Sequence, residues 1–117
     1  MSTSTGAAQR IAARVTSWPG VESGIGSRGE LAFKVGRREI GHLHGDHVAH
    51  FFFPKDVWVE LRWDGWIEEH PVFPGRNGPA ARRIADQRDI EDVVTMMRLN
   101  YDRAAGGPRA VAPGRAA

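Results

Sequence analysis

Histidine is concentrated in one short part of this chain. Four of the five histidines fall between positions 42 and 50, and the fifth is His70. A neutral imidazole can exchange a proton near neutral pH and can bind a transition metal. Residues two apart on a strand share a face and lie about 6.6 Å apart, so His42 and His44 could converge on one ligand. We therefore expect ligand binding or chemistry in this stretch.

The spacing from His42 to His47 is H-x-H-x-D-H, which resembles the zinc motif of the metallo-β-lactamase superfamily. Imidazoles and a carboxylate such as Asp46 are suitable zinc ligands. That superfamily has a much longer four-layer chain with further ligands downstream, and here only His50 and His70 follow the motif. We expect no metal and no cofactor, and a local zinc site unrelated to that superfamily is the alternative.

Other candidate residues lie farther along the chain. His70 follows two glutamates, and a histidine beside a carboxylate can transfer protons in acid–base catalysis. Arg98 and Tyr101 lie in a predicted C-terminal helix that would pack on the sheet. The candidate pocket residues are His42, His44, Asp46, His47, His70, Arg98 and Tyr101. None of them is assigned a catalytic role.

Composition excludes several classes of protein. The 117 residues suffice for one domain, whereas a (β/α)₈ barrel needs about 250. The absence of cysteine excludes disulfides, thiolate zinc sites and cysteine nucleophiles. The chain has no nucleophile elbow, no phosphate-binding glycine loop and no apolar run of about 18 residues. The N-terminus has no signal-peptide pattern, so we expect a cytoplasmic protein with no membrane partner.

The isoelectric point of about 9.7 suggests nucleic acid as a partner. However, the net charge is +2, and Arg109 and Arg115 in the last twelve residues account for it. A nucleic-acid-binding domain would show a basic stripe, for which Arg76, Arg82, Arg83 and Arg88 are the nearest candidates. We therefore expect a small molecule or a protein as the partner, with nucleic acid unlikely and the oligomeric state open.

Alternating apolar residues predict antiparallel strands over residues 31–35, 38–44 and 47–53. Two-residue turns at 36–37 and 45–46, each beginning with glycine, would join them into a meander. Counting from these turns pairs Phe33 with Ile40, and His42 with Ala49. The predicted core face comprises Leu31, Phe33, Val35, Ile40, Phe51 and Phe53.

The predicted register also places the histidines. His42, His44 and His47 would lie at the turn end of the core face, beside an apolar floor, which is how small-ligand pockets are usually lined. His50 is expected on the opposite face, together with Leu43. The hairpin rim is therefore the predicted pocket.

Helices are predicted on both sides of the meander, over residues 6–17 and 55–64, although a strand is the rival reading of the second segment. Trp63 would pack inward from the second helix. Residues 66–73 predict a strand, and residues 80–84 fit either a strand or a helical turn. The last helix would begin with Asp89 as its N-cap.

These elements predict an α+β domain over residues 6–105. Its N-terminal helix leads to a three-stranded antiparallel meander, a short middle helix and one or two further strands. A C-terminal helix packs on the sheet. Residues 1–5 and the Ala/Gly/Pro/Arg tail at 106–117 are expected to be disordered.

Several blocks occur in an order that resembles a small bacterial and fungal domain of unknown function called luciferase family protein. They are Trp18-Pro19-Gly20-Val21, residues 36–46, Phe53-Pro54, residues 70–74 and residues 98–103. The resemblance covers residues 14–103, and its most specific part is Gly41-His42-Leu43-His44-Gly45-Asp46. Light-producing luciferases are far larger barrel or adenylating enzymes, so the resemblance implies a fold and a family label without bioluminescence.

The chain departs from that family pattern at one place. The family has Ser-Gly-Trp and then a strand after the proline that corresponds to Pro74. Residues 75–81 stand there instead and contain no tryptophan. The resemblance therefore leaves open whether residues 75–84 keep the strand.

Two classes of function follow from these residues. The first is a binding module for a small molecule or a protein, with its pocket at the rim of the histidine-bearing hairpin. The alternative is a small metal-assisted or acid–base enzyme that uses the same histidines with Asp46 or His70. A weak nucleic-acid binder is the third hypothesis, and whether the chain is an enzyme stays open at this point.

Overall fold

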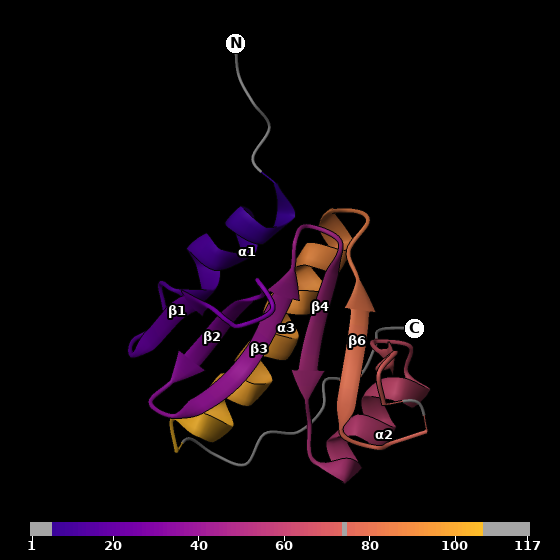
Figure 1. Cartoon of the computed structure of the whole chain (residues 1–117). Helices are drawn as coiled ribbons and strands as arrows, with labels where there is room; N and C mark the ends of the chain where they lie inside the picture. The colour runs from indigo at the N-terminus through magenta and orange to yellow at the C-terminus, as the bar shows by residue number, and fades with distance from the viewer. Residues whose placement is uncertain (1–5, 74, 107–117) are drawn as a thin grey trace.

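One antiparallel sheet forms the front layer of the fold (Figure 1). The structure is a computed structural model that describes residues 6–73 and 75–106. Within these residues the strand order is β1-β2-β3-β4-β6-β5. The strands are β1 Val21–Ile25, β2 Leu31–Val35, β3 Arg38–His44, β4 Val48–Phe52, β5 Glu68–Glu69 and β6 Pro79–Arg83. The segments predicted to be disordered, residues 1–5 and 106–117, lie outside the described residues except for Gly106.

Helices cover one face of this sheet. The helices are α1 Ala7–Val15, α2 Lys55–Trp63 and α3 Gln87–Ala104. Helix α3 lies behind β3 and β4, and α1 packs beside it (Figure 1). Side chains such as Ile11 of α1, Met97 of α3 and Phe33 of β2 are fully buried between the two layers. The α+β architecture, the meander and the C-terminal helix on the sheet are confirmed.

Helix α2 lies beside β6 (Figure 1). The indole nitrogen of Trp58 donates to the carbonyl of Pro79 at 2.9 Å, which joins α2 to β6. The helix predicted for this segment is confirmed, and the rival strand is not formed. The inward packing predicted for Trp63 is wrong, because this last residue of the helix is 89% exposed.

Helix α3 begins earlier than the sequence suggested. Its N-cap is Asp86 and not Asp89, because Asp86 accepts a hydrogen bond from the backbone of Asp89 at 2.9 Å. The Asp89 carboxylate accepts from the backbone of Asp86 in return, and the two form a capping box. Asp89 is thus the third residue of the helix.

The sheet differs from the prediction at its edges. Strand β1 was not predicted, because its residues are mostly exposed and show no apolar alternation. Of the strand predicted over residues 66–73, only the two residues of β5 form a strand. The ambiguous residues near 80 form β6, which pairs with β4, so the chain keeps a strand where it departs from the family pattern.

The register of β2 and β3 contains a β-bulge that the prediction lacks. Lys34 pairs with Glu39 as expected, but Phe33 pairs with Gly41, so Ile40 is an extra residue. Ile40 and Gly41 both lie toward the helices. A Cβ atom at Gly41 would stand 2.6 Å from the sulfur of Met97, so a larger residue here would require the end of the Met97 side chain to move.

The bulge reverses the faces of β3 beyond it. Leu43 is fully buried in the core, whereas His42 and His44 lie on the open face of the sheet. Their predicted place on the core face is therefore wrong. The second turn has three residues and not two, so His42 pairs with His50 across β3 and β4.

Candidate functional site

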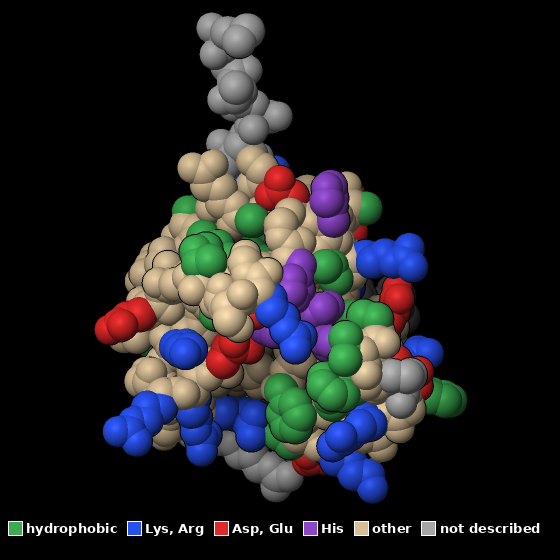
Figure 2. Space-filling view, viewed as in Figure 1, with side chains coloured by type: hydrophobic (Ala, Val, Ile, Leu, Met, Phe, Trp, Pro, Cys, Tyr) green, Lys and Arg blue, Asp and Glu red, His purple; other side chains and the backbone are tan. Residues whose placement is uncertain are grey.

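Four histidines meet on the open face of the sheet, and we call them the histidine cluster. They are His42 and His44 from β3, His50 from β4 and His70, which follows β5. Ring centroids lie 5.0 Å apart for His42 and His44, 4.6 Å for His44 and His50, and 4.1 Å for His50 and His70. Figure 2 shows histidine side chains gathered on this face, with hydrophobic side chains next to them.

Hydrogen bonds orient one end of the cluster. Nδ1 of His42 lies 2.9 Å from Oε2 of Glu39. An ionised carboxylate only accepts hydrogen bonds, so His42 donates through Nδ1. In the neutral ring Nε2 is then left as an acceptor or as a metal ligand.

A second chain of hydrogen bonds orients the other end. The backbone N–H of Val72 donates to Nδ1 of His70 at 3.1 Å, so neutral His70 carries its proton on Nε2. This Nε2 lies 3.1 Å from Nδ1 of His50 and donates to it. Neutral His50 therefore carries its own proton on Nε2, as a donor.

Burial, and to a smaller extent the neighbouring histidines, together lower the pKa of His50 to about 4. The pKa of His70 is also lowered, first by burial and then by His42 and His44. Both side chains belong to residues that are less than one-tenth exposed. The two imidazoles are thus neutral at physiological pH, as the hydrogen-bond chain requires.

Three members of the cluster have the arrangement of metal ligands. One ring nitrogen each of His42, His44 and His50 lies within 4.8 Å of the other two. Neutral imidazole nitrogen is a good ligand for zinc and other first-row transition metals. Asp46 and His47, the other members of the sequence motif, are not part of this group.

Two hollows border the cluster. One has a volume of about 300 Å³ and is lined by apolar side chains that include Phe52, Phe73 and Pro79, beside Glu39, Arg76 and three of the histidines. The other, of about 330 Å³, is lined by all four histidines with Arg28, Glu30, Val72 and Phe73. The cluster therefore forms the polar floor of a groove whose walls are partly aromatic.

The structure places Asp46 and His47 outside this groove. Oδ1 of Asp46 accepts a hydrogen bond from the backbone N–H of Ala8 at 2.9 Å, in the first turn of α1. A Cβ atom at Gly6, the N-cap residue, would stand 2.6 Å from this carboxylate. Asp46 thus caps a helix from a distant turn, and His47 is exposed beside it.

Arg98 and Tyr101 are also far from the histidine cluster, since they belong to α3 behind the sheet. The guanidinium of Arg98 lies 5.1 Å from the ring of Trp18 and 5.0 Å from that of Tyr101. The hydroxyl of Tyr101 donates to the carbonyl of Pro19 at 2.6 Å. These contacts hold the loop between α1 and β1 against α3.

The sequence reading missed several groove residues. It did not join His50 to His42 and His44, and it overlooked Glu39, Phe52 and Phe73. The available signal was Gly41 inside an otherwise regular strand, because glycine in a strand interior often marks a bulge. A bulge there puts His42, His44 and His50 on one face.

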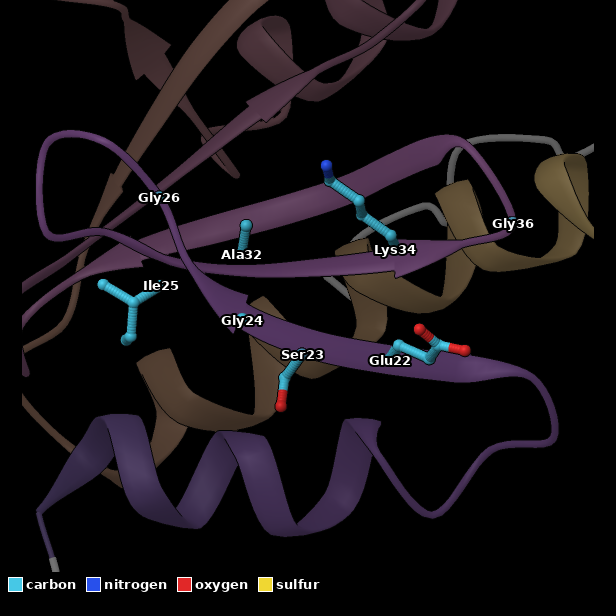
Figure 3. A pocket seen from close by; sticks show the side chains of 8 residues that line it. All are labelled: Glu22, Ser23, Gly24, Ile25, Gly26, Ala32, Lys34 and Gly36. Carbon is cyan, nitrogen blue, oxygen red and sulfur yellow. The ribbon is translucent and has the colours of Figure 1, made fainter.

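A third hollow lies over the other end of the sheet (Figure 3). It is lined by residues of β1, β2 and the adjoining turns, including Glu22, Gly24, Ala32 and Lys34. Glu22 and Lys34 are cross-strand partners. The lining brings together no set of ligand-type side chains comparable with the histidine cluster.

No helix within residues 6–73 and 75–106 combines the length and the apolar character needed to cross a membrane.

No curated protein and no solved structure matches the chain. A family model, the Luciferase domain, matches residues 37–100, which span β3, β4 and most of α3. This region contains the whole histidine cluster and more than half of the chain. The chain therefore belongs to the Luciferase domain family.

Proposed function

We propose that this protein is a binding module for a small organic molecule, which lies in the groove over the histidine cluster. The observation that carries the proposal is the direct contact between a polar histidine floor and an apolar wall in one hollow. Ligand sites usually combine apolar walls with a few oriented polar groups. The neighbouring hollow of about 330 Å³ continues the same histidine floor along Val72 and Phe73, whereas the linings of the hollows at β1 and at the end of α3 contain no histidine.

The polar groups indicate which chemistry the ligand would offer. Nε2–H of His50 is a donor, and Arg76 adds a cation at the rim, where its guanidinium lies 5.9 Å from the ring of Phe73. Phe52 and Phe73 are 68% and 42% exposed, so both leave apolar surface for a ligand to cover. A molecule with a flat apolar body and a carbonyl or carboxylate end fits these groups.

The paired Glu39 and His42 support acid–base catalysis as a second candidate. A histidine held by a carboxylate is a common general base, because the carboxylate orients the ring and favours its protonated form. If the protein is an acid–base catalyst, it should convert a compound bound in the groove into a product. Mass spectrometry of each bound compound after incubation with the protein tests it, with His42→Ala as the comparison.

The proposal is tested by an NMR screen of a soluble library of aromatic and aliphatic acids, amides and amines. We expect saturable shifts of the backbone amides of His42, His50, Phe52 and Phe73. Phe73→Ala should abolish these shifts, because it removes one wall of the groove. Trp63→Ala is the matched control, since this aromatic ring is exposed on α2 away from the groove.

Two results would overturn the proposal. One is a screen without any saturable shift at the groove. The other is a set of hits that Phe73→Ala leaves unchanged, since those molecules would bind elsewhere.

A further inference from the structure

We propose that His42, His44 and His50 form a binding site for one divalent first-row transition metal ion, of which Zn²⁺ is the reference. This inference goes beyond the proposed function, because the metal is bound by the chain alone and needs no organic ligand. The three side chains come from two neighbouring strands, so the sheet itself positions them.

The strand register brings these ligands together. His42 and His50 are direct partners across β3 and β4, and His44 follows His42 on the same face. Their ring nitrogens lie within 4.8 Å of one another. Ligands on a tetrahedral zinc ion, at about 2.0–2.1 Å from the metal, are about 3.4 Å apart. The part-buried rings of His42 and His44 can close this difference by small rotations.

The hydrogen bond between Glu39 and His42 supports the site. Histidine ligands of metals commonly donate their other ring N–H to a carboxylate, which fixes the ring and raises its basicity. Here Nδ1 of His42 is paired with the Glu39 carboxylate at 2.9 Å, so Nε2 is the ligand atom. This is the arrangement that a metal-bound histidine needs.

The contact between His50 and His70 sets a cost for metal binding. Nδ1 of His50 faces His70, so its Nε2 is the ligand atom and must lose its proton. His50 can then carry its proton on Nδ1 instead, provided that Nε2 of His70 accepts a hydrogen bond from it. His70 must then carry its own proton on Nδ1 and give up the bond from the Val72 N–H, so the Val72 amide reports on metal binding.

The ligand set indicates which metals would bind. Three imidazoles favour zinc, copper, iron or nickel, whereas calcium and magnesium require oxygen ligands. Structural zinc sites generally have four protein ligands, and sites with three leave a position for water or a ligand. The hollow of about 330 Å³ that all four histidines line adjoins this position. A coordination position for an exchangeable water or ligand is thus expected.

The test is calorimetric titration of ZnCl₂ into the full chain, without an affinity tag and after treatment with a chelator. We expect one equivalent to bind, and Co²⁺ in the same site to show visible ligand-field absorption. His42→Ala and His44→Ala should each weaken binding by at least about 100-fold, the upper end of the effect of outer-shell changes. His47→Ala, an exposed histidine of the same hairpin, should bind like the wild type.

The NMR spectrum of the metal-loaded protein gives a second readout. The Val72 amide should shift on addition of one equivalent of Zn²⁺, and the amide of Gly24 on β1 should not. Absence of zinc binding would overturn the proposal, as would equal losses in His47→Ala and His42→Ala. His50→Asn keeps a polar side chain at this buried position, and unchanged zinc affinity in it would also contradict the site. None of these results depends on the organic-ligand screen, so the two proposals fail separately.

Discussion

The side-chain amide of Asn100 donates to the carbonyl oxygen of Ile40 at 3.2 Å and thereby joins α3 to the bulged residue of β3. The same amide donates to the carbonyl of Phe52 at 3.2 Å, at the end of β4. A carbonyl that a bulge removes from the strand ladder needs another donor when it is buried. Asn100 supplies it and so stabilises the register that gathers the histidines.

We expect Asn100→Leu to destabilise the fold by about 2–3 kcal/mol, because the buried carbonyl of Ile40 and the part-buried carbonyl of Phe52 lose a donor. Denaturant unfolding followed by circular dichroism measures this loss. Thr95→Ala, on the exposed side of the same helix, should change the stability by less than about 0.5 kcal/mol. If Asn100→Leu were as stable as Thr95→Ala, the hydrogen bonds from Asn100 would not stabilise the bulge.

Asp46 is predicted to act on stability and not on the site. Asp46→Ala removes the acceptor for the Ala8 N–H in the first turn of α1 and should cost about 1 kcal/mol. Zinc affinity should stay at the wild-type value, because Asp46 is outside the three-histidine group. The two values come from denaturant unfolding and calorimetry on one preparation. If Asp46→Ala weakened zinc affinity and left the stability unchanged, Asp46 would have to contribute to metal binding.

Glu39→Gln should weaken zinc binding by about 10–100-fold without loss of the fold, because the amide holds the His42 ring less strongly than the carboxylate does. The side chain of Glu39 is 40% exposed, so the substitution adds no buried polar group. Calorimetry with ZnCl₂ gives the affinity, and Glu22→Gln on the same sheet face is the control. Equal affinities in the two variants would mean that Glu39 does not orient a ligand.

The ion pairs of Arg82 predict a loss of stability in acid. Arg82 donates to Asp89 and, at 2.8 Å, to Asp92. Burial raises the pKa of Asp89, but the bonds from Arg82 and from the backbone of Ala85 and Asp86 outweigh it and hold the pKa below 3.8. The unfolded chain thus binds the proton more tightly. Asp89 contributes stability above pH 3.8, and this contribution is lost as the pH falls through its folded pKa.

Asp89→Asn is the variant that checks this sign. At pH 7 it should lower the free energy of unfolding by about 2 kcal/mol, since a charged hydrogen-bond network is interrupted. The gap between wild type and variant should narrow as the pH is lowered below 3.8. A gap that stays constant with pH would show that Asp89 titrates alike in the folded and unfolded chains.

The same ion pairs bear on the third hypothesis from the sequence. Arg82 and Arg88 both lie within 4.0 Å of Asp92, so two of the four arginines in the suggested basic stripe are already paired with a carboxylate. Arg76 lies against Phe73 at the groove. The positions of these three arginines favour small-molecule binding in the groove and argue against a surface that binds nucleic-acid phosphates.

Local pattern was sufficient to predict most elements of this fold. Alternation over 31–53 specified the meander, because each strand exposes one face and buries the other. Helical spacing of apolar residues specified α1 and α3, because a helix on a sheet buries one stripe. The sequence by itself also identified the histidine-rich hairpin as the region of interest.

Tertiary structure decided which histidines meet. The close approach of Met97 to Gly41 and the bond from Asn100 favour a bulge, and one extra residue moves His42 and His44 to the other face. His70 reaches the cluster after α2 and the two-residue strand β5, which is too short to show an apolar alternation. These contacts join residues distant in the chain, so no local pattern encodes them. The sequence therefore determined the ligand types, and packing against α3 determined their common site.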